Sequence, residues 1–416
     1  MKETKPLPLA GVRVLEMGSL IAGPFAAKIL GEFGAEVIKI EQSPSGDPLR
    51  KWRKLHNGTS LWWQIQSRNK KSVSIDLKSE EGQDLVRQLA QTCDVVVENF
   101  RPGTLEKWGL GWDVLSELNP KLIMLRISGY GQTGPYRDLP GFGVIGEAMG
   151  GLRYVTGYPD RPPVRVGVSL GDSLASLHGV MGIMFALYHR DRHQGRGQII
   201  DVALYESVFN IMESLIPEQD FFGHTRERTG SVLPGIAPTN AYRCRDGNHV
   251  LVAGNGDGIF RRLMEAIGRS DLAENPRYQQ NDGRVANVEM LDHAIEAWTM
   301  TRTQDEVLSV LANASVPAGK IYSASDILND PHYQARQMIQ SIETKDGTRL
   351  KVPGIVPKLS ETPGQIRQSA PDLGEHTDEV LRDLGLRDEQ ILALRERGSS
   401  ANHSKPFRYL QAQAHV

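Results

Sequence analysis

Cysteine is scarce in this chain, which has only Cys93 and Cys244 among its 416 residues. Both lie in apolar or strand-like surroundings with no metal-ligand spacing, so they provide neither a disulfide framework nor a metal site. The N-terminus lacks the apolar core of a signal peptide and does not resemble a transit peptide. This pattern fits a reducing compartment, and we expect a cytoplasmic protein without a bound metal.

An excess of charge of one sign and a long hydrophobic run are also missing. The formal net charge is −2, so the overall charge gives no affinity for nucleic acid or an anionic membrane. The longest uninterrupted apolar run lies within residues 179–188 and is too short to span a bilayer. We therefore expect neither a nucleic-acid partner nor a membrane partner. The length of 416 residues favours two domains.

Strand-like and helix-like segments alternate through the first half of the chain. This alternation predicts an α/β fold with a mostly parallel sheet and helices on both of its faces. In such sheets, ligands bind beyond the carboxyl ends of the strands. The strands are predicted at residues 11–16, 36–41, 72–77, 94–98 and 121–127, and loops that leave strand ends begin at residues 17, 42, 99 and 129.

The composition changes near residue 223, where a segment rich in Gly, Pro and Thr indicates a domain boundary. A hairpin at Asp246-Gly247 and several amphipathic helices follow, which predicts a smaller α+β domain. The pattern changes again near Ala324. We predict a large domain from residues 1–224 and 326–398, a small domain from residues 225–325, and a linker-like tail from residues 399–416.

The segment Val166–His193 carries two stripes at helical spacing, one bulky and one of small residues. Glycine inside a helix costs about 1 kcal/mol relative to alanine, so the small stripe indicates close packing and we expect a deeply buried helix. Asp172 lies near its start. This aspartate is either an N-cap or a functional carboxylate stabilised by the helix dipole, and the local sequence does not separate the two. The bulky stripe is Leu174, Leu177, Met181, Met184 and Tyr188, and the small stripe is Ala175, Gly179, Gly182 and Ala186.

Two further patterns have alternative interpretations. The glycines of Gly129–Gly134 match the G-x-G-x-x-G dinucleotide motif, but Pro135 and the residues after it do not open the helix that this motif requires. A nucleotide-cofactor oxidoreductase is therefore kept as an alternative. The basic runs Arg50–Lys54 and Arg68–Lys71 are interpreted as solvated surface, or as contacts to an anionic ligand with several phosphates.

Several motifs occur in a fixed order, and each alone is a modest signal. Together they are very specific, and through them the chain resembles the class III CoA-transferases of the formyl-CoA and carnitine CoA-transferase type, over residues 8–395. The motifs are Ala22-Gly23-Pro24, Leu30–Glu41, Val97–Gly103, Ser128–Pro135, Gly171-Asp172-Ser173, Gly195–Gln198 and Leu373–Thr377.

The resemblance implies a large Rossmann-like domain built from both ends of the chain, a small domain, and an interlocked homodimer. It implies that Asp172 attacks an acyl-CoA thioester to give an aspartyl mixed anhydride and then an aspartyl-CoA thioester. The substrates would be an acyl-CoA and a small carboxylic acid, with no permanently bound cofactor. The donor would be succinyl-CoA and the acceptor a short dicarboxylate.

The resemblance also implies the binding residues. This chain has Ile21 where oxalate-handling members of the family have glutamine, Gln42 in place of a basic residue, and Lys107 in place of an arginine. The glycine-run loop of formyl-CoA transferase is absent, and Leu233–Ala237 lies in that region. These departures argue against strict formyl-CoA/oxalate specificity. A racemase of the same fold needs a histidine where this chain has Phe142. The implied CoA contacts are Ile21, Ala22, Gln42, Ile75, Lys78, Asn99, Phe100, Arg101 and Lys107, and the implied substrate pocket includes Phe142 and Gly143.

Overall fold

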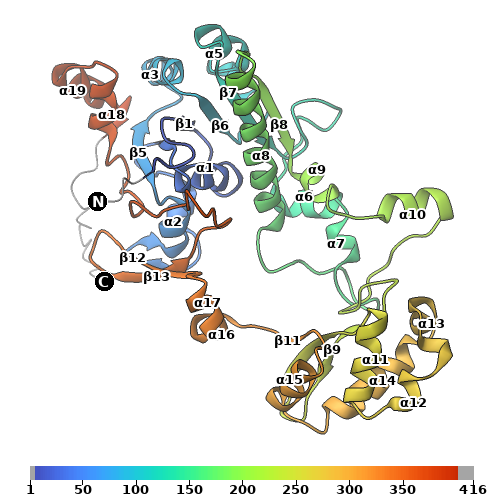
Figure 1. The fold of residues 1–416 in the computed structure, drawn as a ribbon. Coiled ribbons are helices and arrows are strands. Elements are labelled where there is room, and N and C mark those ends of the chain that lie inside the picture. The colour runs from blue at the N-terminus through green and yellow to red at the C-terminus, as the bar shows by residue number, and fades with distance from the viewer. Residues whose placement is uncertain (1–4, 402–416) are drawn as a thin grey trace, which may run out of the picture. The chain divides into compact units, whose positions relative to one another are not determined.

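The computed structural model describes residues 5–401, and the chain forms two compact units (Figure 1). Within the described residues, the large unit contains the chain up to residue 152, residues 166–213 and the chain from residue 336. The small unit contains residues 153–165 and 214–335. The N-terminal and C-terminal segments therefore build one unit together.

The large unit is organised around a seven-stranded sheet whose order is β14-β5-β2-β1-β6-β7-β8. All neighbouring strands pair in parallel except β14, which pairs antiparallel with β5. Without β14, this is the doubly wound order of Rossmann-like folds, so the predicted mostly parallel sheet is confirmed. The strands are β1 (Arg13–Glu16), β2 (Glu36–Glu41), β5 (Lys70–Ile75), β6 (Val95–Glu98), β7 (Ile123–Ser128), β8 (Ile199–Ala203) and β14 (Ser400–Ala401).

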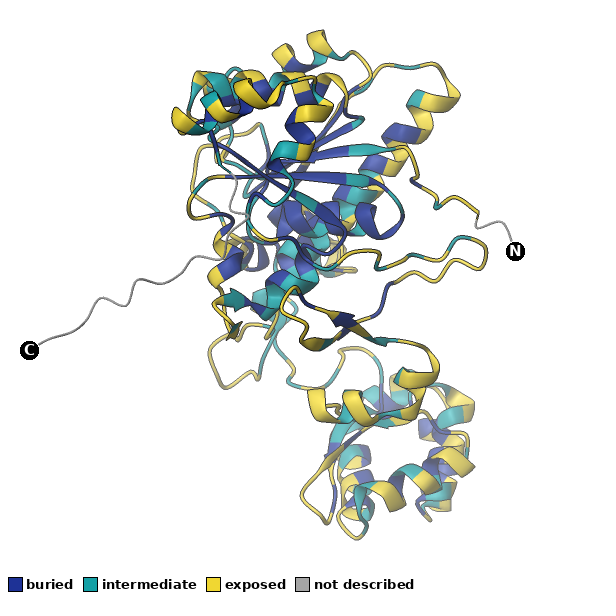
Figure 2. Cartoon of the chain, turned by 90° about the vertical axis from the view of Figure 1, so that its left-hand side faces the viewer, coloured by how far each residue is buried: buried dark blue, intermediate teal, exposed yellow. Residues whose placement is uncertain are grey.

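Helices cover both faces of this sheet, and its strands are buried between them (Figure 2). Alternate strand residues such as Val14 and Leu15 therefore enter two different apolar cores. One face carries α1 (Ala22–Glu32) and α8 (Leu170–Arg192), and the other carries α3 (Glu80–Gln91), α5 (Trp112–Leu118), α18 (Thr377–Asp383) and α19 (Asp388–Glu396).

Shorter elements complete the large unit. They are β3 (Leu55–His56), β4 (Thr59–Ser60), α2 (Leu61–Gln66), α4 (Thr104–Lys107), α6 (Gly143–Met149), α9 (Leu204–Phe209), β12 (Ile339–Glu343) and β13 (Arg349–Pro353), with a 3-10 helix at Pro48–Lys51.

The segment after Gly398 does not begin as a linker. Ser399 and Ser400 are buried, and Ser400–Ala401 form the edge strand β14, in which Ser400 pairs with Ile75. The remainder of the predicted tail lies outside the described residues.

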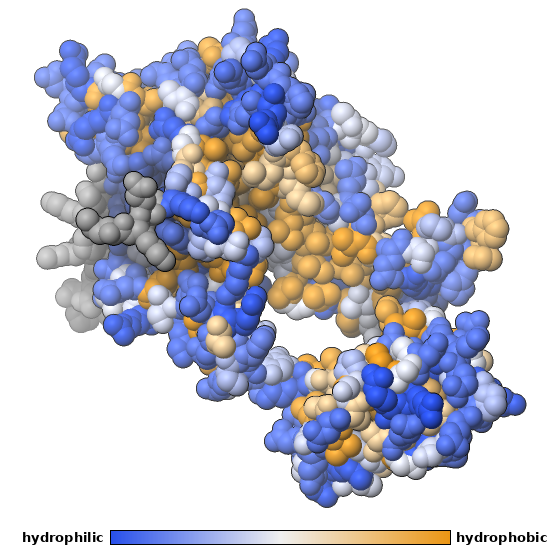
Figure 3. All heavy atoms as spheres, viewed as in Figure 1, coloured by the Kyte–Doolittle hydropathy of each residue, from blue (hydrophilic) through white to orange (hydrophobic). Residues whose placement is uncertain are grey.

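Helix α8 is confirmed, but its burial differs between its two faces. A Cβ on Gly179 would lie 2.7 Å from Leu125, and one on Gly182 would lie 2.7 Å from Ile200, so the small stripe packs directly on the sheet. The bulky stripe faces away from it, and Met181 and Tyr188 are 45% and 64% exposed. The prediction of deep burial is therefore wrong for this face. Hydrophobic surface gathers in this region of the large unit (Figure 3).

By length and composition alone, α8 is long and apolar enough to cross a membrane. It is the one such helix among residues 5–401, and core helices of soluble proteins meet the same criterion.

The small unit contains the antiparallel sheet β11-β10-β9, packed against amphipathic helices. The predicted hairpin at Asp246-Gly247 joins β9 to β10 and is confirmed. The strands are β9 (Thr239–Arg243), β10 (His249–Ala253) and β11 (Ala318–Lys320). The helices are α10 (Leu215–Phe222), α11 (Asp257–Ala266), α12 (Ser270–Ala273), α13 (Asn281–Val285), α14 (Val288–Thr299), α15 (Gln304–Asn313), α16 (Ala324–Asn329) and α17 (Pro331–Ala335), with a second 3-10 helix at Pro276–Tyr278. The first residue of α7 (Leu152–Val155) belongs to the large unit and the rest to the small unit.

Candidate functional site

The strand order reverses between β1 and β6, and this switch point is where doubly wound sheets bind ligands. The loops that follow these two strands are joined by Asn99. Its Oδ1 accepts from the Ser19 N–H at 2.8 Å, and its Nδ2 donates to the Ser19 carbonyl at 2.9 Å. A Cβ on Gly18 would lie only 2.8 Å from Asn99 Oδ1, so this contact needs glycine there.

Asp172 lies in the first turn of α8, where the helix dipole favours a carboxylate. The N-cap position belongs to Ser169, so the interpretation of Asp172 as the N-cap is wrong. One turn later, the Ser176 hydroxyl lies 2.7 Å from the carbonyl oxygens of both Ala22 and Asp172. The start of α8 is thereby attached to the start of α1, next to the switch point.

The start of α6 lies directly against Asp172. A Cβ on Gly143 would lie 2.1 Å from Asp172 Oδ2, so only glycine leaves room for this carboxylate. Phe142, just before α6, is 68% exposed. Glu147, which the sequence motifs do not single out, is buried, and its Oε1 accepts from the Gly171 N–H at 3.4 Å. Its one signal is an acidic side chain within the mostly small and apolar stretch from 143 to 151.

The loop after β6 holds three of the predicted CoA contacts, Asn99, Phe100 and Arg101. Buried Glu98 accepts from the Phe100 N–H at 2.7 Å and from Arg126 Nε at 2.7 Å. Burial raises the pKa of Glu98 to about 7, against the opposing effect of Arg126. Arg101 is exposed and donates to the Asp138 carbonyl at 2.5 Å.

The other predicted contacts follow neighbouring strands of the same sheet. Gln42 comes directly after β2, and Lys78 comes shortly after β5; both are exposed. Ile75 ends β5, and its side chain lies in the apolar core, so only its backbone can meet a ligand. Lys107 ends α4 and is exposed. Parallel pairing places the carboxyl ends of β5, β2, β1 and β6 along one edge. The role of each residue in binding stays a prediction.

The basic runs are not simply solvated surface. Arg50, Arg68 and Lys70 are each less than 9% exposed. Arg68 pairs with Glu32, and Lys70 pairs with Glu16. Arg50 pairs with Glu41. The interpretation of these three residues as surface is therefore wrong, because each pairs with an acidic side chain in the interior.

The glycines at 129–134 follow β7, but no helix begins at them, and the next helix is α6 at Gly143. The pyrophosphate site of a dinucleotide fold needs a helix N-terminus at that point. This stretch therefore lacks the local structure that the oxidoreductase alternative requires.

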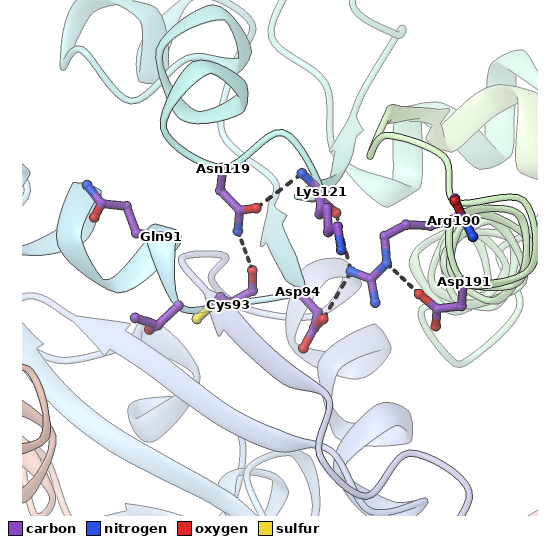
Figure 4. A pocket seen from close by; sticks show the side chains of 9 residues that line it. Gln91, Cys93, Asp94, Asn119, Lys121, Arg190 and Asp191 are labelled. Carbon is purple, nitrogen blue, oxygen red and sulfur yellow. Dashed lines mark hydrogen bonds and ion pairs between the residues drawn. The ribbon is translucent and has the colours of Figure 1, made fainter.

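A separate cavity of about 610 Å³ lies at the amino ends of β6 and β7, away from the switch point (Figure 4). Three of its charged groups pair with one another, since Arg190 contacts Asp94 at 3.0 Å and Asp191 at 2.8 Å. Burial raises the pKa of the Cys93 thiol to about 12, so this thiol is not a reactive nucleophile at neutral pH.

The doubly wound sheet with a carboxylate beside its switch point defines a Rossmann-like α/β protein. The family model CoA-transferase family III matches residues 9–377. The chain belongs to this family, and it is a CoA-transferase.

Relatives with known names agree with this assignment. The chain is 50% identical over 391 residues to succinyl-CoA–D-citramalate CoA-transferase of Chloroflexus aurantiacus, covering 94% of this chain and 97% of that protein. It is 45% identical to the beta subunit of succinyl-CoA–L-malate CoA-transferase of the same organism, covering 95% and 98%. A solved CAIB/BAIF family protein from Brucella suis is 34% identical and superposes with a TM-score of 0.80, covering 91% of this chain and all of that one.

Proposed function

We propose that this enzyme transfers CoA from succinyl-CoA to a short dicarboxylic acid, with Asp172 as the nucleophile. The observation that carries the proposal is the position of Asp172, in the first turn of α8 and against Gly143 beside the switch point. The relatives support the choice of substrates, because two of those reported above are named for succinyl-CoA together with D-citramalate or L-malate.

The reaction proceeds through covalent intermediates on Asp172. Its carboxylate attacks the thioester carbonyl of the acyl-CoA and expels CoA thiolate, which leaves a mixed anhydride. The thiolate then attacks the Asp172 carbonyl and releases succinate, which leaves an aspartyl-CoA thioester. The acceptor carboxylate attacks this thioester and expels CoA thiolate, which leaves a second mixed anhydride. The thiolate then attacks the acceptor carbonyl of this anhydride, which gives the new CoA ester and free Asp172.

The local structure suits the nucleophile for this role. The positive end of α8 stabilises the Asp172 carboxylate without neutralising it. The missing side chain at Gly143 leaves space against its Oδ2 atom. We propose that Asn99, Phe100 and Arg101 bind CoA, with the Arg101 guanidinium supplying positive charge for its diphosphate.

We propose that the enzyme acts as a cytoplasmic homodimer. The support for a dimer is the bulky apolar face of α8, where Met181, Phe185 and Tyr188 are 45%, 73% and 64% exposed. Exposed apolar patches of this kind mark interaction surfaces.

A racemase of the same fold is disfavoured. Proton transfer at a carbon needs a titratable group opposite the carboxylate, and the residue before Gly143, which lies against Asp172, is Phe142 and not a histidine.

The function is tested by mixing succinyl-CoA, formyl-CoA and acetyl-CoA separately with a panel of mono- and dicarboxylic acids. Chromatography with mass detection would identify each new CoA ester. We expect products with succinyl-CoA and C4–C5 dicarboxylates, and none with Asp172→Asn. Efficient transfer only to monocarboxylates, or full turnover by Asp172→Asn, would contradict the proposal.

A further inference from the structure

A buried cluster of four charged side chains lies beneath the loop that follows β1. It consists of Glu16, Lys39, Asp47 and Lys70, and each side chain is at most 1% exposed. The Lys39 ammonium contacts Glu16 and Asp47, both at 2.8 Å, and the Lys70 ammonium contacts Glu16 at 2.7 Å. The cluster joins β1, β2, β5 and the loop after β2.

Three of these side chains, Lys39, Asp47 and Lys70, also hold the backbone above them, and Glu16 holds the two lysines. Lys39 Nζ donates to the Gly18 carbonyl at 2.8 Å, and Lys70 Nζ donates to the Pro24 carbonyl at 2.7 Å. The Asp47 carboxylate accepts from the Leu20 N–H at 3.1 Å. These contacts bracket Ile21 and Ala22, two of the predicted CoA contacts.

The backbone held in this way is strained. Leu20 has φ of 65°, in the left-handed region that a non-glycine residue occupies only at a cost. Such a conformation persists when its surroundings fix it, and Asp47 supplies the hydrogen bond at Leu20.

Four buried charges are a poor way to stabilise a fold, because apolar residues of similar volume are often as stabilising. Apolar side chains could not, however, hold the carbonyl and N–H groups of the loop. The distinctive effect of this cluster is therefore on the geometry of the loop.

We propose that Glu16, Lys39, Asp47 and Lys70 are positioning residues that hold residues 18–24 in the conformation that binds acyl-CoA. The proposal rests on the function proposed above and deepens it, because it assigns the affinity of the switch point for CoA to a buried ion cluster.

The burial of Lys70 and its ion pair with Glu16 predict that acyl-CoA binding depends on pH. Glu16, Lys39 and Asp47 face the Lys70 ammonium, and burial lowers the pKa of Lys70 to about 8 while Glu16 opposes this effect. As the pH rises through about 8, Lys70 loses its charge and with it the ion pair to Glu16. We expect the KM for acyl-CoA to rise over the same range.

The test compares Glu16→Gln with a matched control, Glu32→Gln. Both carboxylates are buried and each pairs with two cations, Glu16 with Lys39 and Lys70, and Glu32 with Lys28 and Arg68. Glu32 ends α1, at the opposite end of the helix from Ala22. The two substitutions therefore remove equivalent charges, one near the loop and one away from it.

In initial-rate measurements from pH 6 to 9, we expect Glu16→Gln to raise the KM for acyl-CoA about tenfold. It should also shift the alkaline rise of KM to lower pH, because the proton on Lys70 loses its stabilising carboxylate. Glu32→Gln should leave KM within twofold and the pH profile unchanged, although both variants lose thermal stability. Equal KM changes in the two variants, or wild-type KM and pH profile in Glu16→Gln, would overturn the proposal.

Asp47→Asn provides a second variant in case Glu16→Gln does not fold. The amide oxygen still accepts from Leu20, but the charge facing Lys39 is lost, so a threefold to fivefold rise in KM is expected; an unchanged KM would count against the proposal. Titration calorimetry with free CoA measures binding without turnover. The cluster is therefore judged by CoA affinity, whereas the proposed chemistry is judged by Asp172→Asn.

Discussion

Replacing Gly143 with alanine perturbs the nucleophile without touching its chemistry. The backbone of Gly143 is not in the left-handed region, so alanine can adopt it without strain. Its Cβ would, however, lie 2.1 Å from Asp172 Oδ2, where ordinary contacts begin at 3.4 Å. The carboxylate, or the start of α6, must therefore move by more than about 1 Å.

A displacement of this size lowers the rate because the attacking oxygen no longer reaches the thioester in line. Misplacement by about 1 Å can cost about 100-fold in rate, which corresponds to about 2.7 kcal/mol of transition-state free energy. We expect Gly143→Ala to lower kcat by about this factor. The KM for acyl-CoA should change less than threefold, because the switch-point loops are untouched. Initial rates at saturating acceptor measure both constants.

Two alanine substitutions serve as controls. Gly167 has no atom within 4 Å of an added Cβ, so Gly167→Ala should have wild-type kcat. Gly146 lies on α6, where an added Cβ would be 2.8 Å from the Leu204 side chain, so Gly146→Ala reports the effect of disturbed packing alone. If Gly143→Ala kept kcat within threefold of wild type, or lost no more than Gly146→Ala, the steric argument would be refuted.

Three further predictions concern CoA binding, acid stability and assembly. Arg101→Ala should raise the KM for acyl-CoA about tenfold, because the substitution removes one charge-assisted hydrogen bond to CoA. An unchanged KM in initial-rate assays would argue against this contact. Burial raises the pKa of Asp47, but Lys39 and the N–H groups of Leu49 and Leu20 together outweigh burial, so the pKa lies below its ordinary value. The stabilisation from Asp47 is therefore complete above about pH 4 and is lost as the pH falls further. Thermal melts from pH 7 to 3 should show less acid destabilisation in Asp47→Asn than in wild type, and equal slopes would contradict this. Met181→Lys should halve the mass measured by light scattering, because it places a charge on the exposed apolar face of α8. Leu392→Lys, at a residue 54% exposed on α19, should leave the mass unchanged. A dimeric Met181→Lys would exclude the α8 face as the interface.

Local patterns were sufficient to predict most of the fold. Strand β2 has the predicted bounds, residues 36–41, because the segment carries its own pattern and end signals. Ser79 caps α3 by accepting from the Gly82 N–H at 3.0 Å, as its position before two glutamates predicts. These features depend on neighbours in the sequence and are therefore visible in it.

Features that depend on distant partners were missed. Lys70 looks like surface until Glu16 is placed beside it from another strand. The short strand at Ser400–Ala401 forms because the edge of β5 is available to it, and nothing in its composition indicates this. The two stripes of α8 were both visible, but periodicity does not say which of them faces the sheet.

In the candidate site, too, some features were predicted from local motifs and others depend on contacts between distant segments. Asp172 and the Asn99–Arg101 loop were found from their motifs, and the structure places both beside the switch point. The contact between Gly143 and Asp172, and the cluster beneath Ile21 and Ala22, depend on packing between segments far apart in the chain. Sequence reasoning therefore found the chemical groups but not what holds them.

The most direct test of the central claim is to trap the covalent intermediate. The enzyme is incubated with succinyl-CoA, treated with hydroxylamine, digested and mapped by mass spectrometry, with Asp172→Asn treated in parallel. We predict a single hydroxamate, on Asp172, that requires succinyl-CoA and is absent from the variant. A hydroxamate on another carboxylate, or its absence from wild-type enzyme that is turning over, would contradict the account.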